Sequence, residues 1–434
     1  MEWRGDRGGY ALAFPVLLSF IGLLYMMGGN AVDYIMTIIL YSADLRCVVK
    51  NNRQSLQNWN NHDNNVTLRT NFTPAHNISQ QKIMMQHLHH HARIMAATTT
   101  RRALSTTAST HNIFHSSVWP IMATPFHHGT EDVDLPSFSK AIQFMKDAQC
   151  SGVTVVGVLG ESNRLMDAER EAIVREAVRV AGPDMPVCVG TSHPGTRATR
   201  DLSQMAEDLG AAAVMVTPSR EAAPLPPSKM VEFFGQVDDG ISIPIVLQDH
   251  PASTQVNMSM DLVGRICSEV KGVQAVKMES LPSPPKLQQL RTMLQDPDGA
   301  NRPDVALLVG LGALYGAYDC DAGCDGFMTG FAFPEVLRAM IDAKEEGRRD
   351  DLHDMFAKWL PLIVFEQQPG VAVRKEVYRM RGLVESGTVR HPGGELSEWA
   401  TYSLRDVLSR VVQEKIDITK PLSTDQVWVP RGII

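Results

Sequence analysis

Eight short apolar runs recur along the chain from Val118 onward, and together they predict the fold. Each run is rich in valine and isoleucine, is too short for a helix, and is apolar at successive positions, as strands buried on both faces are. The runs are VWPIMA (118–123), VTVVGV (153–158), PVCVGT (186–191), AAVMVT (212–217), IPIVLQ (243–248), VQAVK (273–277), VALLVG (305–310) and GFMTG (326–330).

Amphipathic segments separate these runs. In DAEREAIVREAVRVAG, Asp167 can cap the start of a helix, and one apolar face collects Ile173, Val174, Ala177 and Val178. Strand and helix alternate at about thirty residues, the length of a βα unit. The pattern predicts an α/β fold, a (β/α)8 TIM barrel over residues 116–345.

A doubly wound open sheet is the alternative to the barrel. Its best support is GLGALYG after the seventh run, but the third glycine, Gly316, falls one place late for a dinucleotide-binding motif. Further helical segments after the last strand predict a C-terminal helical bundle over residues 346–415. A tail follows at 416–434.

The first 115 residues differ in composition and predict a targeting and low-complexity region. Residues 10–28 are almost uncharged and long enough to span a bilayer, with Arg4 and Arg7 before them. An Asn/Gln/His-rich tract follows, which has too few apolar residues to pack and is typical of disorder.

A second targeting signal follows this tract. From Met95 the chain reads MAATTTRRALSTTASTHNIFHSS, a stretch with arginines, hydroxyl residues and no acid that is typical of a mitochondrial transit peptide. We favour a start at Met95, a mature chain beginning downstream of Arg102, and the mitochondrial matrix. The alternatives are a membrane anchor through residues 10–28 or a cytoplasmic protein.

Charge and cysteine content narrow the functional classes to which the protein can belong. A formal net charge of -7 gives no basic excess for nucleic acid. Six cysteines without an even framework of spacings indicate a reducing compartment. Cys320 and Cys324 lie among aspartates, but two thiols without a second pair are a weak metal signal. The sequence therefore predicts no metal site.

Lys277 raises the main chemical question, because it ends a short run, VQAVK, that is otherwise mostly apolar and predicted to be buried. Active sites of (β/α)8 barrels lie at the carboxyl ends of the strands. The lysine either extends its ammonium to solvent, or stays partly desolvated so that its amine attacks a carbonyl and forms an imine.

The other strand ends resemble a known family. ATPF (123–126), GVLGESNRLMDAER (157–170), TPS (217–219), PIVLQDHPAST (244–254), VQAVKMES (273–280) and CDGFMTG (324–330) follow in order. Over about residues 116 to 415 the chain resembles the dihydrodipicolinate synthase and N-acetylneuraminate lyase superfamily of class I aldolases. That superfamily carries TPF, GTTGE, TPYY, YNVPGRT and a G-x-K strand.

The resemblance implies a role for several residues. Lys277 corresponds to the lysine that forms the Schiff base. Gly160, Glu161 and Ser162 match the loop that holds the substrate carboxylate, and Thr124 belongs to the TPF motif. Gly310 and Met328 fall where the family's backbone lines the pocket.

Departures from the family pattern affect the proton relay. Val158 and Leu159 stand where the family has two threonines, and Gln248 occupies the catalytic position of the YNVPGRT tyrosine. Glutamine does not transfer a proton. Ser253 replaces the arginine of that motif, and Arg220 replaces the second tyrosine of TPYY, so dihydrodipicolinate synthesis itself is in doubt.

Two nearby residues are candidates to replace the relay. Alternation places Gln248 and His250 on one inward face, and Lys277 and Glu279 on another. His250 titrates in the useful range, and burial could raise the pKa of Glu279 into it. Asp249 should face the helices, and His127 and His128 are weaker candidates.

Two function hypotheses follow from the residues and the resemblance. The first is a Schiff-base lyase that acts on a small 2-oxo acid of the pyruvate type, needs no cofactor, and forms a homo-oligomer, a dimer or a tetramer. The second is a non-catalytic barrel that acts as a binding or scaffold protein after losing the tyrosine and both threonines.

Overall fold

The computed structural model describes residues 112–294, 304–367, 370–413 and 415–429. The apolar segment 10–28, the Asn/Gln/His-rich tract and the transit-like segment up to residue 111 lie outside the described residues. Within the described ranges, no helix combines the length and the apolar character needed to cross a membrane.

Eight parallel strands form the barrel. They are β1 (Ser117–Pro120), β2 (Val153–Val155), β3 (Val187–Gly190), β4 (Ala213–Val216), β5 (Ile245–Asp249), β6 (Val273–Met278), β7 (Ala306–Val309) and β8 (Gly326–Thr329). All eight predicted strands are present, and several are shorter than the apolar runs. The second run ends early because Val156 has a φ of 57°, a left-handed conformation that stops a strand.

Strand order shows that the sheet closes. The hydrogen-bonded order is β1-β8-β7-β6-β5-β4-β3-β2. Ile121, just after β1, bridges Thr154 of β2, and the Met122 N–H donates to the Thr154 carbonyl at 2.8 Å. The fold is a (β/α)8 barrel, as predicted, and the doubly wound alternative is wrong.

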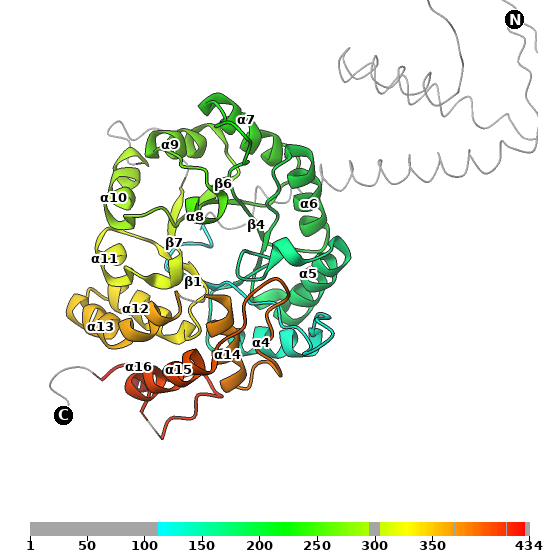
Figure 1. Ribbon diagram of the computed structural model, residues 1–434. Coiled ribbons are helices and arrows are strands. Elements are labelled where there is room, and N and C mark those ends of the chain that lie inside the picture. The colour runs from blue at the N-terminus through cyan, green and yellow to red at the C-terminus, as the bar shows by residue number, and fades with distance from the viewer. Residues whose placement is uncertain (1–111, 295–303, 368–369, 414, 430–434) are drawn as a thin grey trace, which may run out of the picture. The chain divides into compact units, whose positions relative to one another are not determined.

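Helices surround the strands as a ring (Figure 1). They are α4 (Leu135–Asp147), α5 (Asp167–Ala181), α6 (Thr196–Asp208), α7 (Pro227–Asp238), α9 (Met260–Glu269), α10 (Ser283–Leu294), α11 (Gly316–Asp321) and α12 (Pro334–Glu345). Short helical turns lie in the loops: η1 (Ser162–Arg164), η2 (Gly182–Asp184), α8 (Pro251–Thr254) and η3 (Leu311–Ala313).

The start of α5 differs from the expectation. Asp167 is the first helical residue and not the cap, because the cap position belongs to Met166, whose N–H donates to Glu169 at 2.8 Å. The predicted apolar face is otherwise present, since Ile173, Val174 and Ala177 are buried.

Two separate cores explain why the strands are apolar on both faces. Alternate strand residues fill the barrel interior, while the others pack outward against the helices. On β6, Ala275 belongs to the interior cluster and Val276 to the outer cluster. The interior cluster contains Phe114, Trp119, Ile121, Cys188, Ala213, Met215, Val246, Ala275, Ala306, Leu308 and Met328.

Four C-terminal helices extend the barrel: α13 (Arg349–Phe365), α14 (Val371–Met380), α15 (Glu398–Val411) and α16 (Thr424–Val427). They lie together beside α12 and α4 (Figure 1) and belong to the same compact unit as the barrel. The described part of the predicted tail packs on this unit, because Leu422 and Val427 are buried and the Trp359 indole N–H donates to the Val427 carbonyl at 3.2 Å.

A buried arginine ties these helices to the barrel. Arg381, just after α14, is fully buried and forms an ion pair with Glu335 at the start of α12. Its guanidinium also donates to the carbonyl of Ala332 at 2.7 Å and to that of Ile418 at 2.9 Å. Phe144 and Phe333 lie over the guanidinium with ring centroids 4.4 and 4.3 Å away.

Removing this arginine should destabilise the whole protein. Arg381→Ala leaves the Glu335 carboxylate buried with the Leu422 N–H but without a counter-charge, so the free energy of unfolding should fall by about 3–5 kcal/mol. Arg379→Ala is the matched control, because its ion pair with Glu376 is partly exposed and contributes about 0.2–1 kcal/mol. Urea unfolding of both variants measures the difference, and equal losses would contradict the assignment.

Candidate active site

Lys277 lies inside the mouth of the barrel at the carboxyl end of β6. It pairs in register with Gln248 of β5 on one side and Leu308 of β7 on the other. Since Ala275 belongs to the interior cluster, the two-residue alternation directs Lys277 and then Glu279 inward. The lysine is only 3% exposed, so its ammonium does not extend into solvent.

Glu279 gathers the other candidate residues around its carboxylate. Oε2 lies 3.2 Å from the Lys277 Nζ and accepts a hydrogen bond of 2.6 Å from the Gln248 amide. His250 Nδ1 lies 3.8 Å from the same oxygen. Oε1 accepts the Leu311 N–H at 3.2 Å. The four residues that the sequence placed on inward faces therefore meet at one carboxylate.

The protonation of this group differs from the expectation. Burial would raise the pKa of Glu279, but Lys277, His250 and the hydrogen bonds from Gln248 and Leu311 outweigh it and hold the pKa below its ordinary value. The prediction that burial brings Glu279 into the neutral range is wrong. Burial lowers the pKa of His250, with Lys277 acting in the same direction against Glu279, so its imidazole is neutral at pH 7.

Gly310 makes room for this carboxylate. It follows β7, and its N–H donates to the Met278 carbonyl at 3.2 Å. A Cβ added at Gly310 would overlap the Glu279 side chain. The position requires glycine because the carboxylate packs directly on the backbone, a steric reason that sequence reasoning did not supply.

The loop after β2 places its residues differently from one another. Val158 is 46% exposed, whereas Leu159 packs on the barrel interior above Gly330. Thr124 holds the loop, because its hydroxyl donates to the Gly160 carbonyl at 2.7 Å. Met328, assigned to the pocket by resemblance, lies fully buried in the interior cluster.

Glu161 directs its carboxylate to Lys375 and Arg390 of the C-terminal region. It is 2% exposed, forms an ion pair with Lys375 of α14, and accepts bonds of 2.7 Å from Arg164 and 3.1 Å from the Arg390 N–H. Burial lowers the pKa of Lys375 to about 8, against the effect of Glu161. With its carboxylate occupied in this way, any contact of Glu161 to a substrate falls to its backbone.

Some backbone N–H groups of the loop after β2 donate hydrogen bonds within the protein, and others do not. Glu161 and Ser162 donate theirs to the carbonyls of Val158 and Gly157, at 3.0 and 3.4 Å. Across the part of the chain that the structure describes, the N–H groups of Leu159 and Gly160 have no hydrogen-bond partner. Two backbone donors thus remain beside the positions where the family pattern has threonine hydroxyls.

Other sequence candidates lie outside this group. Asp249 points toward the helix layer, as alternation predicts, and burial raises its pKa to about 6. His128 contacts Thr388 at 3.3 Å, and His127 lies near Asp134 in the loop between β1 and α4. Cys320 and Cys324 are buried with sulfurs 3.7 Å apart, and among the described residues no third ligand joins them.

Sequence reasoning missed the residues that support the site from the C-terminal region. Lys375 and Arg390 hold the loop after β2 through Glu161. Arg374 packs against Gly312 and Gly330 at the ends of β7 and β8, and pairs with the buried Glu366 at 3.1 Å. A buried lysine and arginine in one helical segment, VAVRKEVYRM, are the signal that could have drawn attention to it.

The fold and the site together define a (β/α)8-barrel protein with a buried lysine at the carboxyl end of its sixth strand. More particularly, the chain belongs to the dihydrodipicolinate synthetase family, whose family model matches residues 115–411. The resemblance inferred from the strand ends is confirmed, and the non-catalytic alternative is not favoured.

Individual relatives agree with this assignment. The chain is 34% identical over 304 residues to L-2-keto-3-deoxyarabonate dehydratase of Azospirillum brasilense, covering 67% of this chain and 92% of the relative. It is 27% identical over 298 residues to 4-hydroxy-tetrahydrodipicolinate synthase of Methanococcus vannielii, covering 67% and 97%. The crystal structure of dihydrodipicolinate synthase from Rhodopseudomonas palustris superposes with a TM-score of 0.64 at 34% identity, covering 69% of this chain and 99% of that one.

Proposed function

We propose that this protein is a Schiff-base-forming lyase that acts on a small 2-oxo acid of the pyruvate type. The observation that carries the proposal is the buried Lys277 amine, 3.2 Å from an ionised carboxylate at the barrel mouth. A buried amine with a base in contact is the arrangement that imine formation requires.

Glu279 supplies the proton transfers of imine formation. Its Oε2 takes a proton from the Lys277 ammonium, and the free amine attacks the C2 carbonyl of the 2-oxo acid. The carbonyl oxygen leaves as water after taking two protons, one from the attacking nitrogen and one from Glu279. A protonated imine remains on Lys277. Gln248 transfers no proton and holds Glu279 in place through its 2.6 Å hydrogen bond.

The substrate carboxylate needs donors near Lys277. Val158 and Leu159 offer no hydroxyl, but the free N–H groups of Leu159 and Gly160 lie on the loop where the family holds that carboxylate. Adjacent backbone N–H groups in a turn bind anions without side-chain donors. We assign the carboxylate to these groups, with Ser162 and Thr124 shaping the loop.

Two lyase reactions can follow from the imine. The first breaks the C3–C4 bond of a hydroxylated 2-oxo acid, so that an aldehyde leaves and an enamine remains. The second removes a C3 proton and expels the C4 hydroxyl as water. The relative that shares 34% identity is named as a dehydratase of a 2-keto-3-deoxy sugar acid, which favours the second as an alternative to carbon–carbon cleavage.

The proposal also includes a homo-oligomer and the mitochondrial matrix, both carried over from the sequence. Sedimentation of the purified chain tests the first, and cell fractionation with terminal sequencing of the native protein tests the second. A monomer would refute the homo-oligomer. A native chain that retains residues 10–28 would refute the location in the mitochondrial matrix.

Borohydride trapping tests the imine directly. Reduction in the presence of pyruvate should attach a pyruvyl group to the peptide that contains Lys277, detected by mass spectrometry. Lys277→Met should abolish the adduct, whereas Lys271→Met should leave it unchanged, because Lys271 is an exposed lysine just before the same strand. An unmodified Lys277 peptide with pyruvate and with longer 2-oxo acids would refute the imine.

Glu279→Gln separates proton transfer from the capacity to form the imine. Turnover should fall by about 10²- to 10⁴-fold, the usual contribution of a positioned acid or base. The trapped adduct should still reach its full yield, only more slowly. Glu269→Gln is the matched control, because Glu269 is exposed at the end of α9. Unchanged turnover in Glu279→Gln would contradict the proposed relay.

A 2-keto-3-deoxy sugar acid distinguishes the two lyase reactions. Carbon–carbon cleavage releases pyruvate, which an enzyme-coupled assay detects. Dehydration keeps the carbon chain and lowers the mass by one water, which mass spectrometry detects. We expect one of these products to dominate and to disappear in Lys277→Met. A product that persists in that variant would show that the reaction does not pass through the lysine.

A further inference from the structure

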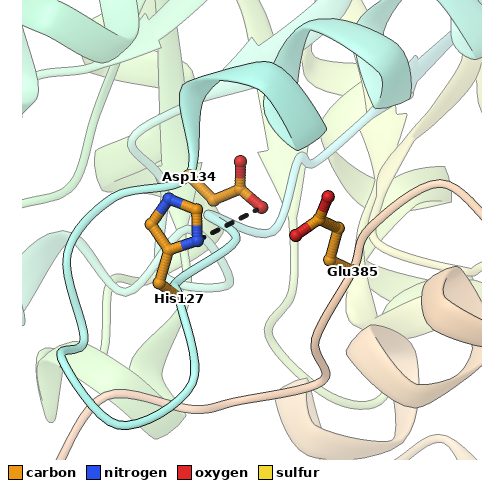
Figure 2. Close-up of side chains that lie close together, drawn as sticks. All are labelled: His127, Asp134 and Glu385. Atoms are coloured by element: carbon orange, nitrogen blue, oxygen red, sulfur yellow. Dashed lines mark ion pairs between the residues drawn. The ribbon is translucent and has the colours of Figure 1, made fainter.

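Three side chains outside the active site converge at the start of α4 (Figure 2). His127 lies near the middle of the loop between β1 and α4, and Asp134 is the last residue of that loop. Glu385 comes from the segment between α14 and α15, about 250 residues further along the chain. One imidazole nitrogen and two carboxylate oxygens of these residues all lie within 4.8 Å of one another.

The loop between β1 and α4 is built so that two of these side chains share a face. Phe126 and Val133 form an antiparallel bridge. The His127 N–H donates to the Asp132 carbonyl at 2.9 Å, and the Asp134 N–H donates to the Pro125 carbonyl at 2.9 Å. In such a ladder, His127 and Asp134 are diagonal neighbours on one side, which keeps their side chains within reach of each other.

The two carboxylate oxygens of Asp134 have different surroundings. It is only 2% exposed, and Oδ1 caps α4 by accepting the Ser137 N–H at 3.0 Å. Oδ2 accepts no hydrogen bond from any residue that the structure describes and points at His127, whose Nδ1 is 4.0 Å away. That distance is too long for a hydrogen bond. One oxygen of a buried carboxylate is therefore aimed at the cluster without a partner in hydrogen-bond contact.

Glu385 is held at the same place by its backbone. Its N–H donates to the Ser137 hydroxyl at 3.3 Å, and the preceding Leu383 and Val384 are buried. Among the described residues, no lysine or arginine pairs with the carboxylate of Glu385 or with that of Asp134. Two carboxylates thus lie close together, and the basic side chain that shares the cluster with them is the imidazole of His127.

We propose that His127, Asp134 and Glu385 bind a divalent transition-metal ion of the Zn²⁺ or Mn²⁺ type. Imidazole and carboxylate together suit these ions, which bind such ligands at about 2.0–2.2 Å. Ligands of one such ion lie about 3–4 Å apart, so a small change in side-chain rotamers closes the site. His127 and Glu385 are exposed, which leaves the remaining positions to water.

Bound metal would join two parts of the molecule that both support the active site. The loop between β1 and α4 contains Thr124, whose hydroxyl donates to the Gly160 carbonyl. The segment with Glu385 leads to Thr388, whose carbonyl accepts a 2.8 Å bond from Lys375, the partner of Glu161. The ion would cross-link these two segments, at a site separate from Lys277.

Binding of Mn²⁺ and Zn²⁺ to the full chain tests the proposal. The HLHHH tract at residues 87–91 can bind metal, so the starting protein should carry alanine at its four histidines. After chelator treatment and dialysis, this protein should bind one equivalent more than its His127→Ala and Glu385→Gln derivatives. Calorimetry gives the stoichiometry for both ions, and electron paramagnetic resonance follows Mn²⁺. Metal should raise the melting temperature of the parent by several degrees and leave the derivatives unchanged.

Control variants exclude damage to the fold. His128→Ala and Glu395→Gln remove an exposed imidazole and an exposed carboxylate from nearby positions, and should keep the extra equivalent. Asp134→Asn retains a cap for α4, because asparagine also accepts the Ser137 N–H, yet it should lose the metal. Equal binding by the parent and His127→Ala would overturn the proposal. So would the absence of any metal-dependent stabilisation in the parent, which would leave His127 as an ordinary ion-pair partner of Asp134.

Discussion

The carboxylate of Glu279 is the contact on which the rest of the barrel mouth depends. A lysine buried among apolar strands requires a counter-charge, and Glu279 provides it 3.2 Å from the amine. That carboxylate is buried in turn, so it needs donors, which Gln248 and the Leu311 N–H supply. Position 310 requires glycine because the Glu279 carboxylate packs directly on its backbone. The ends of three neighbouring strands, β5, β6 and β7, are therefore shaped around one charged pair.

A second buried ion pair, Glu161 with Lys375, connects the barrel mouth to the C-terminal helices. Glu161 lies in the loop after β2 in a left-handed conformation, with a φ of 55°, and its carboxylate forms an ion pair with Lys375 of α14. Because a buried charge without its partner is costly, this pair holds the loop after β2 and the C-terminal helices in one arrangement. The ion pairs Arg374–Glu366 and Arg381–Glu335 act in the same way. The C-terminal helices thus belong to the construction of the site, although they contribute none of the residues around Lys277.

Sequence reasoning reached the features that depend on local periodicity. The eight strands follow from their apolar runs, and the convergence of Gln248, His250, Lys277 and Glu279 follows from alternation along two neighbouring strands. What it missed depends on contacts between distant segments. Lys375 is 214 positions from Glu161, and no local pattern pairs them. The pKa of Glu279 was predicted in the wrong direction for a related reason, since its sign depends on how many donors surround the carboxylate and not on burial alone.

The shared carboxylate also bears on how a barrel without the family's tyrosine could move protons. If Lys277 forms an imine, the protonated imine carries the same positive charge as the ammonium, so Glu279 stays ionised and can act as a base. When the imine becomes a neutral enamine, that positive charge disappears, and burial then favours the protonated form of Glu279. The same residue becomes an acid at the stage where a leaving hydroxyl or an enamine carbon needs a proton. His250, neutral and 3.8 Å away, can exchange that proton with solvent. A single carboxylate coupled to the lysine thus changes from base to acid as the charge on the lysine nitrogen disappears. Gln248 transfers no proton, and its hydrogen bond keeps the carboxylate in place throughout.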